Sequence, residues 1–303
     1  MQFDVRNASV LVTGAGGFIG SHLIAALLAR GATVHAVLRP GSPAVRFQTL
    51  KLRPIIHHVD VTKVDETADL VDRLRPDVVF NLAVCRATEC PRSLRQTNET
   101  AAESLLSACT HAGFRRFVSI GSSLEQQAED QTATAYARSR AAAATKLRVL
   151  AKQLDIPLTH LRTYYVYGPL QDEGKLIPSA LRAAETSESL PLAQNNFRKD
   201  YVYVSDVVRA CFAAVVSDSP PYTEADIATG QQWSVQDVVC LLENLTGRPI
   251  PTRADPAMTR SWDRPDWNTD LAPARNLLGW EPQITLQQGL ADLVANWGAA
   301  NAA

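Results

Sequence analysis

The stretch that decides the fold of this chain is Val10-Leu11-Val12-Thr13-Gly14-Ala15-Gly16-Gly17-Phe18-Ile19-Gly20. An apolar, strand-like run leads into glycines at 14, 17 and 20, and a helix-like run follows them. A tight turn between a strand and a helix needs residues without a Cβ atom, and the start of the helix offers unpaired N–H groups to a phosphate. This spacing therefore predicts a loop that binds the pyrophosphate of a dinucleotide.

Outward from this loop, the first half of the chain alternates short β-branched runs with longer amphipathic stretches. Strands are predicted at Ser9–Thr13, Thr33–Leu38, Ile55–Val59, Val78–Leu82, Phe117–Ile120 and Leu158–Thr163. Helices are predicted at Phe18–Arg30, Glu66–Arg75, Ser93–Ala112 and Tyr136–Leu154. Strands that are apolar almost throughout and separated by helices are typical of a parallel sheet covered on both faces. We therefore predict an α/β fold, a doubly wound parallel sheet of the Rossmann type.

After Gly168 the chain breaks into shorter segments that hold many of its 17 prolines. Helical patterns remain at Ile177–Glu185, Ser205–Val216, Ser234–Thr246 and Leu286–Trp297. This change indicates a smaller C-terminal lobe. We predict a dinucleotide-binding domain over residues 1–168, to which residues 200–230 return, and a mainly substrate-binding lobe over residues 169–303.

Composition excludes several classes of protein. The 303 residues carry 30 Lys+Arg and 31 Asp+Glu, a formal net charge of −1, which disfavours a nucleic-acid partner. The five cysteines form no Cys-x-x-Cys pair, so neither a disulfide framework nor a structural zinc site is expected. Without a run of 18 apolar residues or a signal-peptide pattern, we expect no membrane partner and a cytoplasmic location.

The glycine loop resembles the Thr-Gly-x-x-Gly-x-x-Gly signature of the extended short-chain dehydrogenases/reductases. These form the NAD-dependent epimerase/dehydratase group, which acts largely on nucleotide sugars. Further segments resemble the family in the right order: Asp60-Val61, Asn81-Leu82-Ala83, Asn98, Leu161–Pro169, Asp200–Val208 and Leu278–Pro282. The resemblance implies that the cofactor contacts Gly14, Gly17, Phe18, Ile19, Gly20, Asp60, Val61, Leu82, Ala83, Tyr164 and Val166.

The resemblance also implies a Tyr that moves a proton to or from a sugar oxygen, with a Lys four residues later. A cation beside a phenol lowers its pKa from the usual value near 10. The only fitting segment is Tyr136-Ala137-Arg138-Ser139-Arg140, in which Arg replaces the Lys. Arg keeps its charge and can hydrogen-bond ribose hydroxyls, but it does not relay a proton. Tyr136 and Arg140 are therefore predicted to be catalytic and to contact the cofactor.

The third catalytic group of the family is a hydroxyl just after the fifth strand. Its distance from Phe117 favours Ser122, and Ser123 is the alternative. Dehydratases of the family carry an acidic pair directly after this hydroxyl, where this chain has Ser123-Leu124, although Glu125 is available if the register shifts by one. The short span from Ser122 to Tyr136 predicts a trimmed loop at the mouth of the site.

By the same resemblance, the C-terminal lobe would hold a nucleotide sugar. The candidate substrate-binding residues are Tyr165, Leu176, Arg198, Lys199 and Arg264. Arg264 lies in Trp262–Asp266, which resembles the family's Arg-Pro-x-Asp stretch, and either Arg198 or Lys199 would supply the second cation. Arg suits two-point binding of phosphate, but solvated surface charges are the alternative interpretation.

The end of the second predicted strand indicates which cofactor is used. NAD-specific proteins place an Asp or Glu there for the adenosine ribose, whereas this chain has Leu38 and then Arg39. An Arg can pair with a 2′-phosphate, so NADP(H) is predicted over NAD(H). Arg46 and Arg53 follow in the same region and either add to this positive field or are surface charges.

These expectations favour an NADP-dependent reductase of a keto-sugar nucleotide, of the NDP-4-keto-6-deoxyhexose ketoreductase type. The alternatives are a nucleotide-sugar epimerase or dehydratase with tightly held NAD(P), and a non-catalytic NADP-binding protein, which the Arg at position 140 keeps open. A homodimer is expected by resemblance, through the helices Ser93–Ala112 and Tyr136–Leu154.

Overall fold

A computed structural model of the chain describes residues 4–85, 90–110, 113–131, 133–193, 197–217, 220–260 and 263–301. Residues 111–112 of a predicted helix, and Trp262 in the segment before Arg264, lie outside the described residues.

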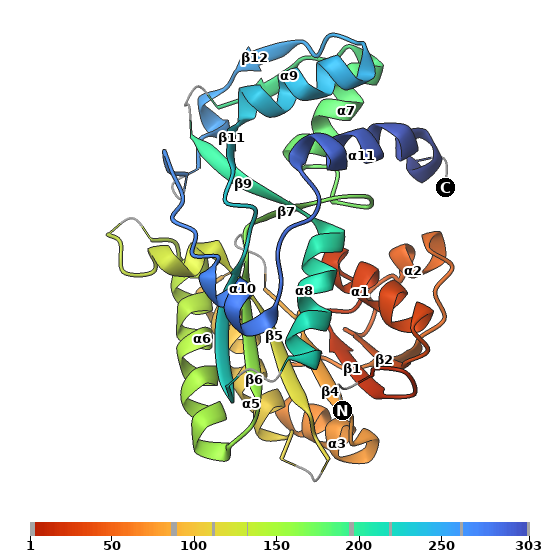
Figure 1. The fold of residues 1–303 in the computed structure, drawn as a ribbon, viewed down its shortest axis with the longest axis vertical. Helices are drawn as coiled ribbons and strands as arrows, with labels where there is room; N and C mark the ends of the chain where they lie inside the picture. The colour runs from red at the N-terminus through yellow and green to blue at the C-terminus, as the bar shows by residue number, and fades with distance from the viewer. Residues whose placement is uncertain are drawn as a thin grey trace.

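Parallel strands form the centre of the larger lobe, in the lower part of Figure 1. The seven strands are β1 (Ser9–Thr13), β2 (Thr33–Leu38), β3 (Ile55–His58), β4 (Val78–Asn81), β5 (Arg116–Ser122), β6 (Leu158–Thr163) and β10 (Tyr222–Ile227). They lie in the order β10-β6-β5-β4-β1-β2-β3, with Val10 of β1 opposite Val34 on one side and Val78 on the other. The strand order reverses beside β1, as in a doubly wound sheet. The predicted fold class is confirmed.

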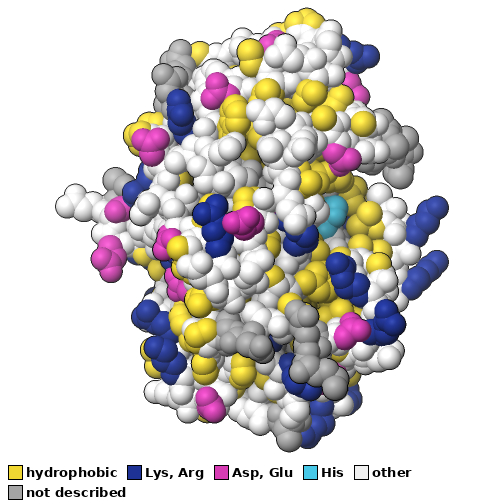
Figure 2. Space-filling model, viewed as in Figure 1, with side chains coloured by type: hydrophobic (Ala, Val, Ile, Leu, Met, Phe, Trp, Pro, Cys, Tyr) yellow, Lys and Arg dark blue, Asp and Glu magenta, His cyan; other side chains and the backbone are white. Residues whose placement is uncertain are grey.

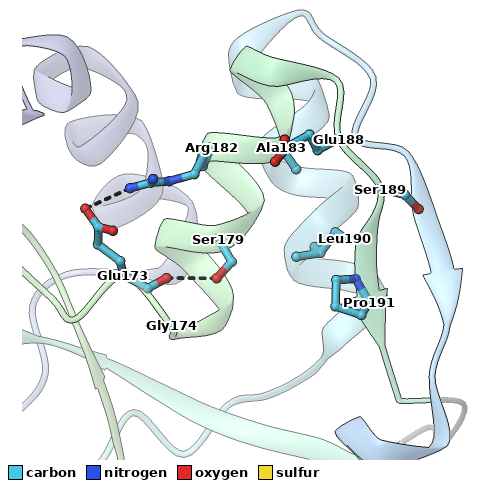
Figure 3. Close-up of a pocket in the computed structure, with 9 residues that line it drawn as sticks. All are labelled: Glu173, Gly174, Ser179, Arg182, Ala183, Glu188, Ser189, Leu190 and Pro191. Atoms are coloured by element: carbon cyan, nitrogen blue, oxygen red, sulfur yellow. Dashed lines mark hydrogen bonds and ion pairs between the residues drawn. The ribbon is translucent and has the colours of Figure 1, made fainter.

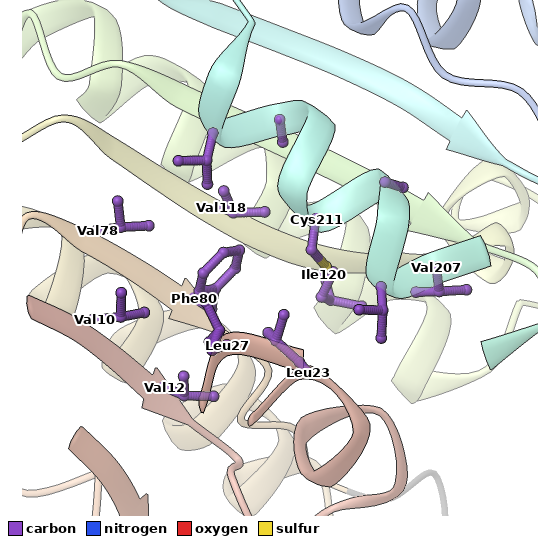
Figure 4. Packing of buried hydrophobic residues seen from close by; sticks show 14 of the residues in the cluster. Val10, Val12, Leu23, Leu27, Val78, Phe80, Val118, Ile120, Val207 and Cys211 are labelled. Atoms are coloured by element: carbon purple, nitrogen blue, oxygen red, sulfur yellow. The ribbon is translucent and has the colours of Figure 1, made fainter. Parts of the chain in front are cut away.

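Helices cover both faces of this sheet because its strands are apolar on both sides. One face packs against α3 (Val64–Leu74), α5 (Ala102–Ser107) and α6 (Ala135–Leu154). The other packs against α1 (Phe18–Ala29), α2 (Val45–Thr49), α8 (Val204–Val216) and α10 (Ala272–Leu278). Figure 4 shows this second interface, where Phe80 and Val118 meet Leu23, Val207 and Cys211.

The smaller lobe lies above the sheet in Figure 1. Its strands are β7 (Tyr165–Tyr167), β9 (Arg198–Tyr203) and β11 (Gln232–Ser234), which form one sheet, and β8 (Leu190–Leu192) and β12 (Thr252–Ala254), which form another. Its helices are α7 (Leu176–Thr186), α9 (Val235–Thr246) and α11 (Leu286–Asn301), with a 3₁₀ turn at Pro256–Met258. Tyr167, Leu181, Leu242 and Leu290 belong to the buried apolar cluster that these elements share.

The helix predicted over Ser93–Ala112 is wrong in part. The segment is α4 (Pro91–Leu94), a π-helical stretch at Arg95–Ala101 and then α5, which ends at Ser107. Within the π-helical stretch, the buried Asn98 accepts from the backbone N–H of Cys85 (2.8 Å) and donates to Ser139 Oγ (2.9 Å). Such π-helical insertions often occur at functional sites, and this one places an amide between β4 and α6.

Segments from the second half of the chain pack against the sheet and helices of the first half. β10 pairs with β6 at the edge of the main sheet, and α8 packs against α1. The indole N–H of Trp280 donates to the backbone oxygen of Asp206 (2.9 Å), and the Asp206 carboxylate accepts from the N–H groups of Gln283 and Ile284. The motifs around Asp206 and Trp280 therefore meet at the start of α8.

Figure 2 shows both basic and acidic side chains scattered over one face of the molecule, in keeping with the balanced net charge. The structure shows no disulfide bond among the five cysteines. In the described part of the chain, no helix is both long and apolar enough to span a membrane, and no three potential metal ligands gather.

Candidate active site

The glycine loop joins β1 to α1 as a close-packed turn. Gly14 has φ +63°, and a Cβ atom there would lie 2.5 Å from the carbonyl carbon of Leu82. A Cβ atom at Gly20 would lie 2.5 Å from the oxygen of Gly14, so helix and strand approach this closely only through glycine. The N-cap is Gly17, no side chain caps α1, and no acidic residue stands in its first turn. This helix start therefore fits the pyrophosphate of a dinucleotide.

The residues after β4, which are predicted to line the cofactor, lie directly beside this loop. Thr13 Oγ1 donates to Asn81 Oδ1 (2.7 Å) and accepts from the N–H of Ala83 at 3.3 Å. The N–H of Leu82 donates to the Thr13 oxygen (3.2 Å). These bonds fix the end of β4 against the end of β1. Phe18 and Ile19 begin α1 and are half-buried, and Val166 packs against the same core.

The end of β2 lies against the same loop. A Cβ atom at Gly16 would be 2.9 Å from Leu38 Cδ2, and the following Arg39 is exposed. Asp60, after β3, is partly buried and accepts from the N–H (3.0 Å) and hydroxyl (2.8 Å) of Thr62, which shapes the turn that carries Val61. Arg39 therefore follows the residue that contacts the glycine loop, and positions 37–40 contain no carboxylate.

Arg46 has contacts that the sequence did not indicate. From α2 it donates to the oxygens of Gly16 (3.2 Å) and Leu170 (3.1 Å) and pairs with Asp172 at 2.6 Å. It thus connects the glycine loop to the chain after β7. Arg53 is exposed.

Ser122 ends β5, and its side chain caps the 3₁₀ turn Ser123–Gln127 that follows. Its Oγ accepts from the N–H of Leu124 (3.3 Å), and its own N–H donates to Glu125 Oε1 (2.9 Å). Ser123 is buried at the start of the turn. This turn forms the first part of the short span before Tyr136 and packs against α6.

Tyr136 and Arg140 lie one turn apart near the start of α6, where Thr134 caps the helix by accepting from the N–H of Ala137 (3.0 Å). Tyr136 is partly exposed, whereas the Arg140 side chain is only 8% exposed. The Arg140 guanidinium donates to the oxygen of Ile120, and its Nε lies 3.7 Å from Glu125 Oε1. The cation that replaces the family Lys is therefore held inside the protein against β5.

Glu125 is the centre of this buried cluster. Its Oε2 lies 2.8 Å from Nε2 of His160 on β6. Burial opposes ionisation of this carboxyl, but His160, Arg140 and the N–H of Ser122 together hold its pKa below the usual value. Sequence reasoning missed His160, because no motif surrounds it and it lies 35 residues from Glu125.

In the smaller lobe, Tyr165 and Lys199 lie together. Lys199 Nζ lies 4.8 Å from the centre of the Tyr165 ring and 3.4 Å from Asp263 Oδ1. The rings of Tyr201 and Trp267 lie 6.0 and 5.6 Å from that of Tyr165. Burial, and then the charge of Asp263, raise the pKa of Tyr165. This cluster presents one cation among aromatic rings, a combination that can hold a polar ligand with apolar faces.

The other predicted substrate residues lie in different settings. Arg198, the neighbour of Lys199 on β9, is exposed, and Leu176 is half-buried at the start of α7. Arg264 forms an ion pair with Asp130, in the loop between the 3₁₀ turn and α6. This pair brings the loop beside the segment around Trp267.

Tyr164, which was predicted to contact the cofactor, is buried, and its hydroxyl is engaged within the protein. The hydroxyl oxygen lies 2.6 Å from the backbone oxygen of Asn268 and 3.1 Å from Asp226 Oδ2. Burial and the neighbouring Asp226 raise the pKa of this phenol. Only its ring or backbone remains for a cofactor contact.

A surface depression of about 340 Å³ lies on the smaller lobe beside α7 (Figure 3). Arg182 pairs with Glu173 across it (2.7 Å), and Ser179 donates to the oxygen of Glu173 (2.9 Å). None of its lining residues is among the predicted site residues, so it is separate from the groups described above.

A family model matches residues 10–227 of this chain, that of the NAD dependent epimerase/dehydratase family. The chain belongs to this family. The resemblance noted from the sequence is therefore confirmed.

Relatives within the family act on nucleotide sugars in different ways. The chain is 29% identical over 315 residues to a UDP-glucose 4-epimerase of Mycolicibacterium smegmatis, covering 94% of this chain and 96% of that protein. It is 26% identical over 317 residues to a dTDP-4-dehydro-6-deoxy-D-allose reductase of a Streptomyces species, covering 95% of each. The structure of MoeE5 in complex with UDP-glucuronic acid and NAD superposes with a TM-score of 0.83 at 27% identity, covering 96% of this chain and 99% of that one.

Proposed function

We propose that this protein is an NADP(H)-dependent reductase of a keto-sugar nucleotide, of the NDP-4-keto-6-deoxyhexose ketoreductase type. The observation that carries the proposal is the end of β2, where the exposed Arg39 follows Leu38 beside the glycine loop. A guanidinium there favours the 2′-phosphate of NADP(H). The similarity to a dTDP-4-dehydro-6-deoxy-D-allose reductase supports the same chemistry.

In this proposal the residues of the chain bind, orient and protonate the keto sugar, and the bound NADPH supplies the hydride. Tyr136 donates its phenolic proton to the carbonyl oxygen of the keto sugar, which becomes a hydroxyl. Ser122 holds the same oxygen: its Oγ already accepts from the N–H of Leu124, so its own proton is available to donate. Ser123 remains the alternative. Arg140, with Tyr136, would lie near the nicotinamide ribose.

The smaller lobe would bind the nucleotide sugar. We propose that Lys199 and Arg264 contact the diphosphate, Arg264 by exchanging Asp130 for phosphate oxygens, and that Tyr165 packs on the sugar. Arg198 and Leu176 are proposed substrate contacts on the same lobe. The division into a cofactor domain (1–168, with 200–230) and a substrate lobe (169–303) stays a proposal.

The surroundings of Glu125 argue against a dehydratase. Elimination of water needs a carboxyl that can exchange a proton with the substrate. The Glu125 side chain is 5% exposed and is held by Ser122, His160 and Arg140. The Glu125 carboxylate is therefore held by groups of the protein itself and is not placed to exchange a proton with a substrate.

An epimerase is the second candidate, favoured by the similarity to a UDP-glucose 4-epimerase. An epimerase returns the hydride to the same sugar and keeps its cofactor, whereas a reductase exchanges its cofactor at each turnover. If the protein is a reductase, the purified protein should carry no stoichiometric nucleotide. Copurified, tightly held NAD would contradict the reductase.

The direct test is NADPH oxidation against a panel of nucleotide-linked 4-keto sugars. Tyr136→Phe should lower kcat about 10²- to 10⁴-fold and leave NADPH binding unchanged, because only the proton donor is lost. Tyr222→Phe is the matched control, since its hydroxyl donates to Glu224 at the sheet edge (2.6 Å). Full turnover by Tyr136→Phe would remove Tyr136 from the mechanism, and no hydride transfer to any keto sugar would favour a non-catalytic NADP-binding protein.

We also propose a homodimer in which α6 and the helical segment predicted over Ser93–Ala112, which includes α5, contribute the contact. Val149 and Leu154 are 47% and 40% exposed on α6, an apolar surface that a second copy would cover. Sedimentation that shows a strict monomer at micromolar concentration would contradict this.

A further inference from the structure

Three buried polar atoms near Tyr165 have no hydrogen-bond partner among the described residues. They are the hydroxyl oxygen of Tyr201, Oδ1 of Asp263 and the indole nitrogen of Trp267. None of these three side chains is more than 5% exposed. A buried polar group without a partner costs free energy, so a ligand that supplies hydrogen bonds to these atoms is favoured at this place.

The Tyr165 ring connects these side chains. Its centre lies 6.0 Å from that of the Tyr201 ring and 5.6 Å from that of Trp267. Lys199 Nζ lies 4.8 Å from the centre of the same ring and 3.4 Å from Asp263 Oδ1. Burial and, after it, the charge of Asp263 raise the pKa of both Tyr165 and Tyr201. Asp263 therefore lies close enough to both phenols to act on them.

Contacts with the rest of the protein hold two of these side chains in place. Gln232 on β11 accepts from the N–H of Trp267 (2.7 Å) and donates to the Trp267 oxygen (2.9 Å). The N–H of Arg260 donates to Asp263 Oδ2 (3.0 Å), and this bond leaves Oδ1 for another donor. The site is thus organised before a ligand binds, which lowers the cost of binding.

The cluster lies beside the turn that carries the proposed catalytic hydroxyl. Leu124, which follows Ser123 in that turn, packs together with Tyr165 against the apolar group that contains Trp267. The Lys199 side chain is 19% exposed and Tyr165 is partly buried, so a ligand can reach the cluster from their side. This place suits the sugar of a substrate whose reacting carbon must lie near the turn.

The polar groups of the cluster favour a neutral ligand. A carboxylate only accepts hydrogen bonds, so Asp263 Oδ1 requires a donor such as a hydroxyl group. Because Asp263 already offsets the charge of Lys199, an anionic group placed beside Asp263 would meet a like charge in a buried setting. The Trp267 N–H and the Tyr201 hydroxyl can donate to hydroxyl oxygens, and the aromatic rings provide apolar faces. A sugar ring with free hydroxyl groups matches both features.

We propose that Tyr201, Asp263 and Trp267 form a subsite around Tyr165 that binds the hydroxyl groups of a neutral hexose and excludes a uronic acid. The proposal rests on the proposed function, which makes a nucleotide sugar the substrate. Asp263 determines the specificity, because it accepts from a hydroxyl group and repels a second carboxylate.

The test is the binding of UDP-glucose and UDP-glucuronic acid to the full chain, measured by isothermal titration calorimetry. The two sugars differ only at C6, where a carboxylate replaces a hydroxymethyl group. UDP-glucose should bind at least about tenfold more tightly, because the glucuronate meets the Asp263 carboxylate. Asp263→Asn, which can still accept from the N–H of Arg260, should reduce this ratio to about threefold or less. Equal binding of the two sugars by the wild type, tighter binding of the glucuronate, or binding of neither would overturn the proposal.

Asp255→Asn is the matched control. It makes the same change in an ion pair of the same lobe and the same length, since Arg253 Nη1 lies 3.4 Å from Asp255 Oδ2. Both side chains of this pair are more exposed than those of Lys199 and Asp263, so the ratio of the two affinities should stay at the wild-type value. A ratio that falls equally in Asp255→Asn would overturn the proposal, because the effect would then come from the charge of the whole lobe.

Tyr201→Phe distinguishes a sugar from a buried water as the partner of these groups, and it covers the case in which Asp263→Asn does not fold. Without ligand, this variant should unfold at the same or a higher temperature than the wild type, because a buried hydroxyl without a partner is removed. It should bind UDP-glucose about two- to tenfold more weakly, the loss expected for one hydrogen bond. A lower unfolding temperature with unchanged sugar binding would show that a buried water satisfies the hydroxyl, and it would overturn the proposal.

The binding measurements need no hydride transfer, so the proposed function is tested separately. A preference for UDP-glucose without NADPH oxidation in the presence of any keto sugar would count against the reductase alone. NADPH oxidation by a protein that does not discriminate between the two sugars would count against the subsite alone.

Discussion

Two arginines contribute differently because their surroundings differ. Arg39 is exposed at the end of β2, while Arg140 is buried against Glu125. An exposed guanidinium can pair with an incoming phosphate, but one that is already compensated cannot add net charge to its neighbours. The residue type alone does not distinguish these two roles. They differ because Arg140 has a buried carboxylate beside it and Arg39 is exposed.

Arg39→Ala should weaken NADPH binding by about 1–3 kcal/mol, the amount expected for loss of a charge-assisted contact, and NADH binding far less. Titrating both cofactors into wild type and variant measures this. Arg53→Ala is the control, since Arg53 is exposed in the same stretch of chain. Equal losses for the two cofactors, or a wild type that prefers NADH, would show that the 2′-phosphate is not bound at Arg39.

The sequence placed Tyr136 on the correct helix, and it placed Ser122 just after the fifth strand, of which the structure makes it the last residue. Both placements depend on local spacing. The sequence could not choose between Arg198 and Lys199, since β9 was not predicted. Alternation along β9 leaves Arg198 exposed and turns Lys199 toward Tyr165. The contact of His160 with Glu125 also could not be predicted, because the two residues come from different elements and no motif joins them.

At the scale of elements, the strands of the first half were predicted to within two residues at each end, since long apolar runs bounded by polar turns define them. The strands β7 and β11 were missed because three residues carry little periodicity, and β9 was missed because it begins with the charged residues Arg198-Lys199-Asp200 rather than with an apolar run. The π-helical stretch was also missed. Nothing in a helical pattern shows where one side chain will bind across two other elements, as Asn98 does.

Asn98→Ala should lower the free energy of unfolding by about 1–3 kcal/mol, because it removes both bonds of a buried amide that joins the end of β4 to α6. Urea unfolding followed by circular dichroism measures the loss. Ser104→Ala, which removes only an exposed hydroxyl bonded to Thr100 in the same segment, is the matched control. Equal stability of Asn98→Ala and the control would mean that the amide does not hold the π-helical stretch in place.

At the scale of the whole molecule, the two halves of the chain share one core. Val207, Ala210, Cys211 and Ala214 of α8 are 0% exposed, in the cluster that α1 and β1 also form. β10 covers the edge of β6 with a continuous parallel register from Leu158 to Thr163. Arg46 adds a polar connection from the glycine loop to the chain after β7.

Residues 1–168 expressed alone should therefore fail to fold cooperatively, although they contain the glycine loop, Tyr136 and Arg140. Without residues 204–227 the fragment exposes the apolar surface under α8 and leaves β6 as an unpaired edge, two features that promote aggregation. Size-exclusion chromatography, urea unfolding and NADPH titration, each beside the full chain, measure this. A monomeric fragment with a cooperative transition and full NADPH affinity would show that the cofactor domain is complete by residue 168, because the contacts of α8 and β10 would then be dispensable.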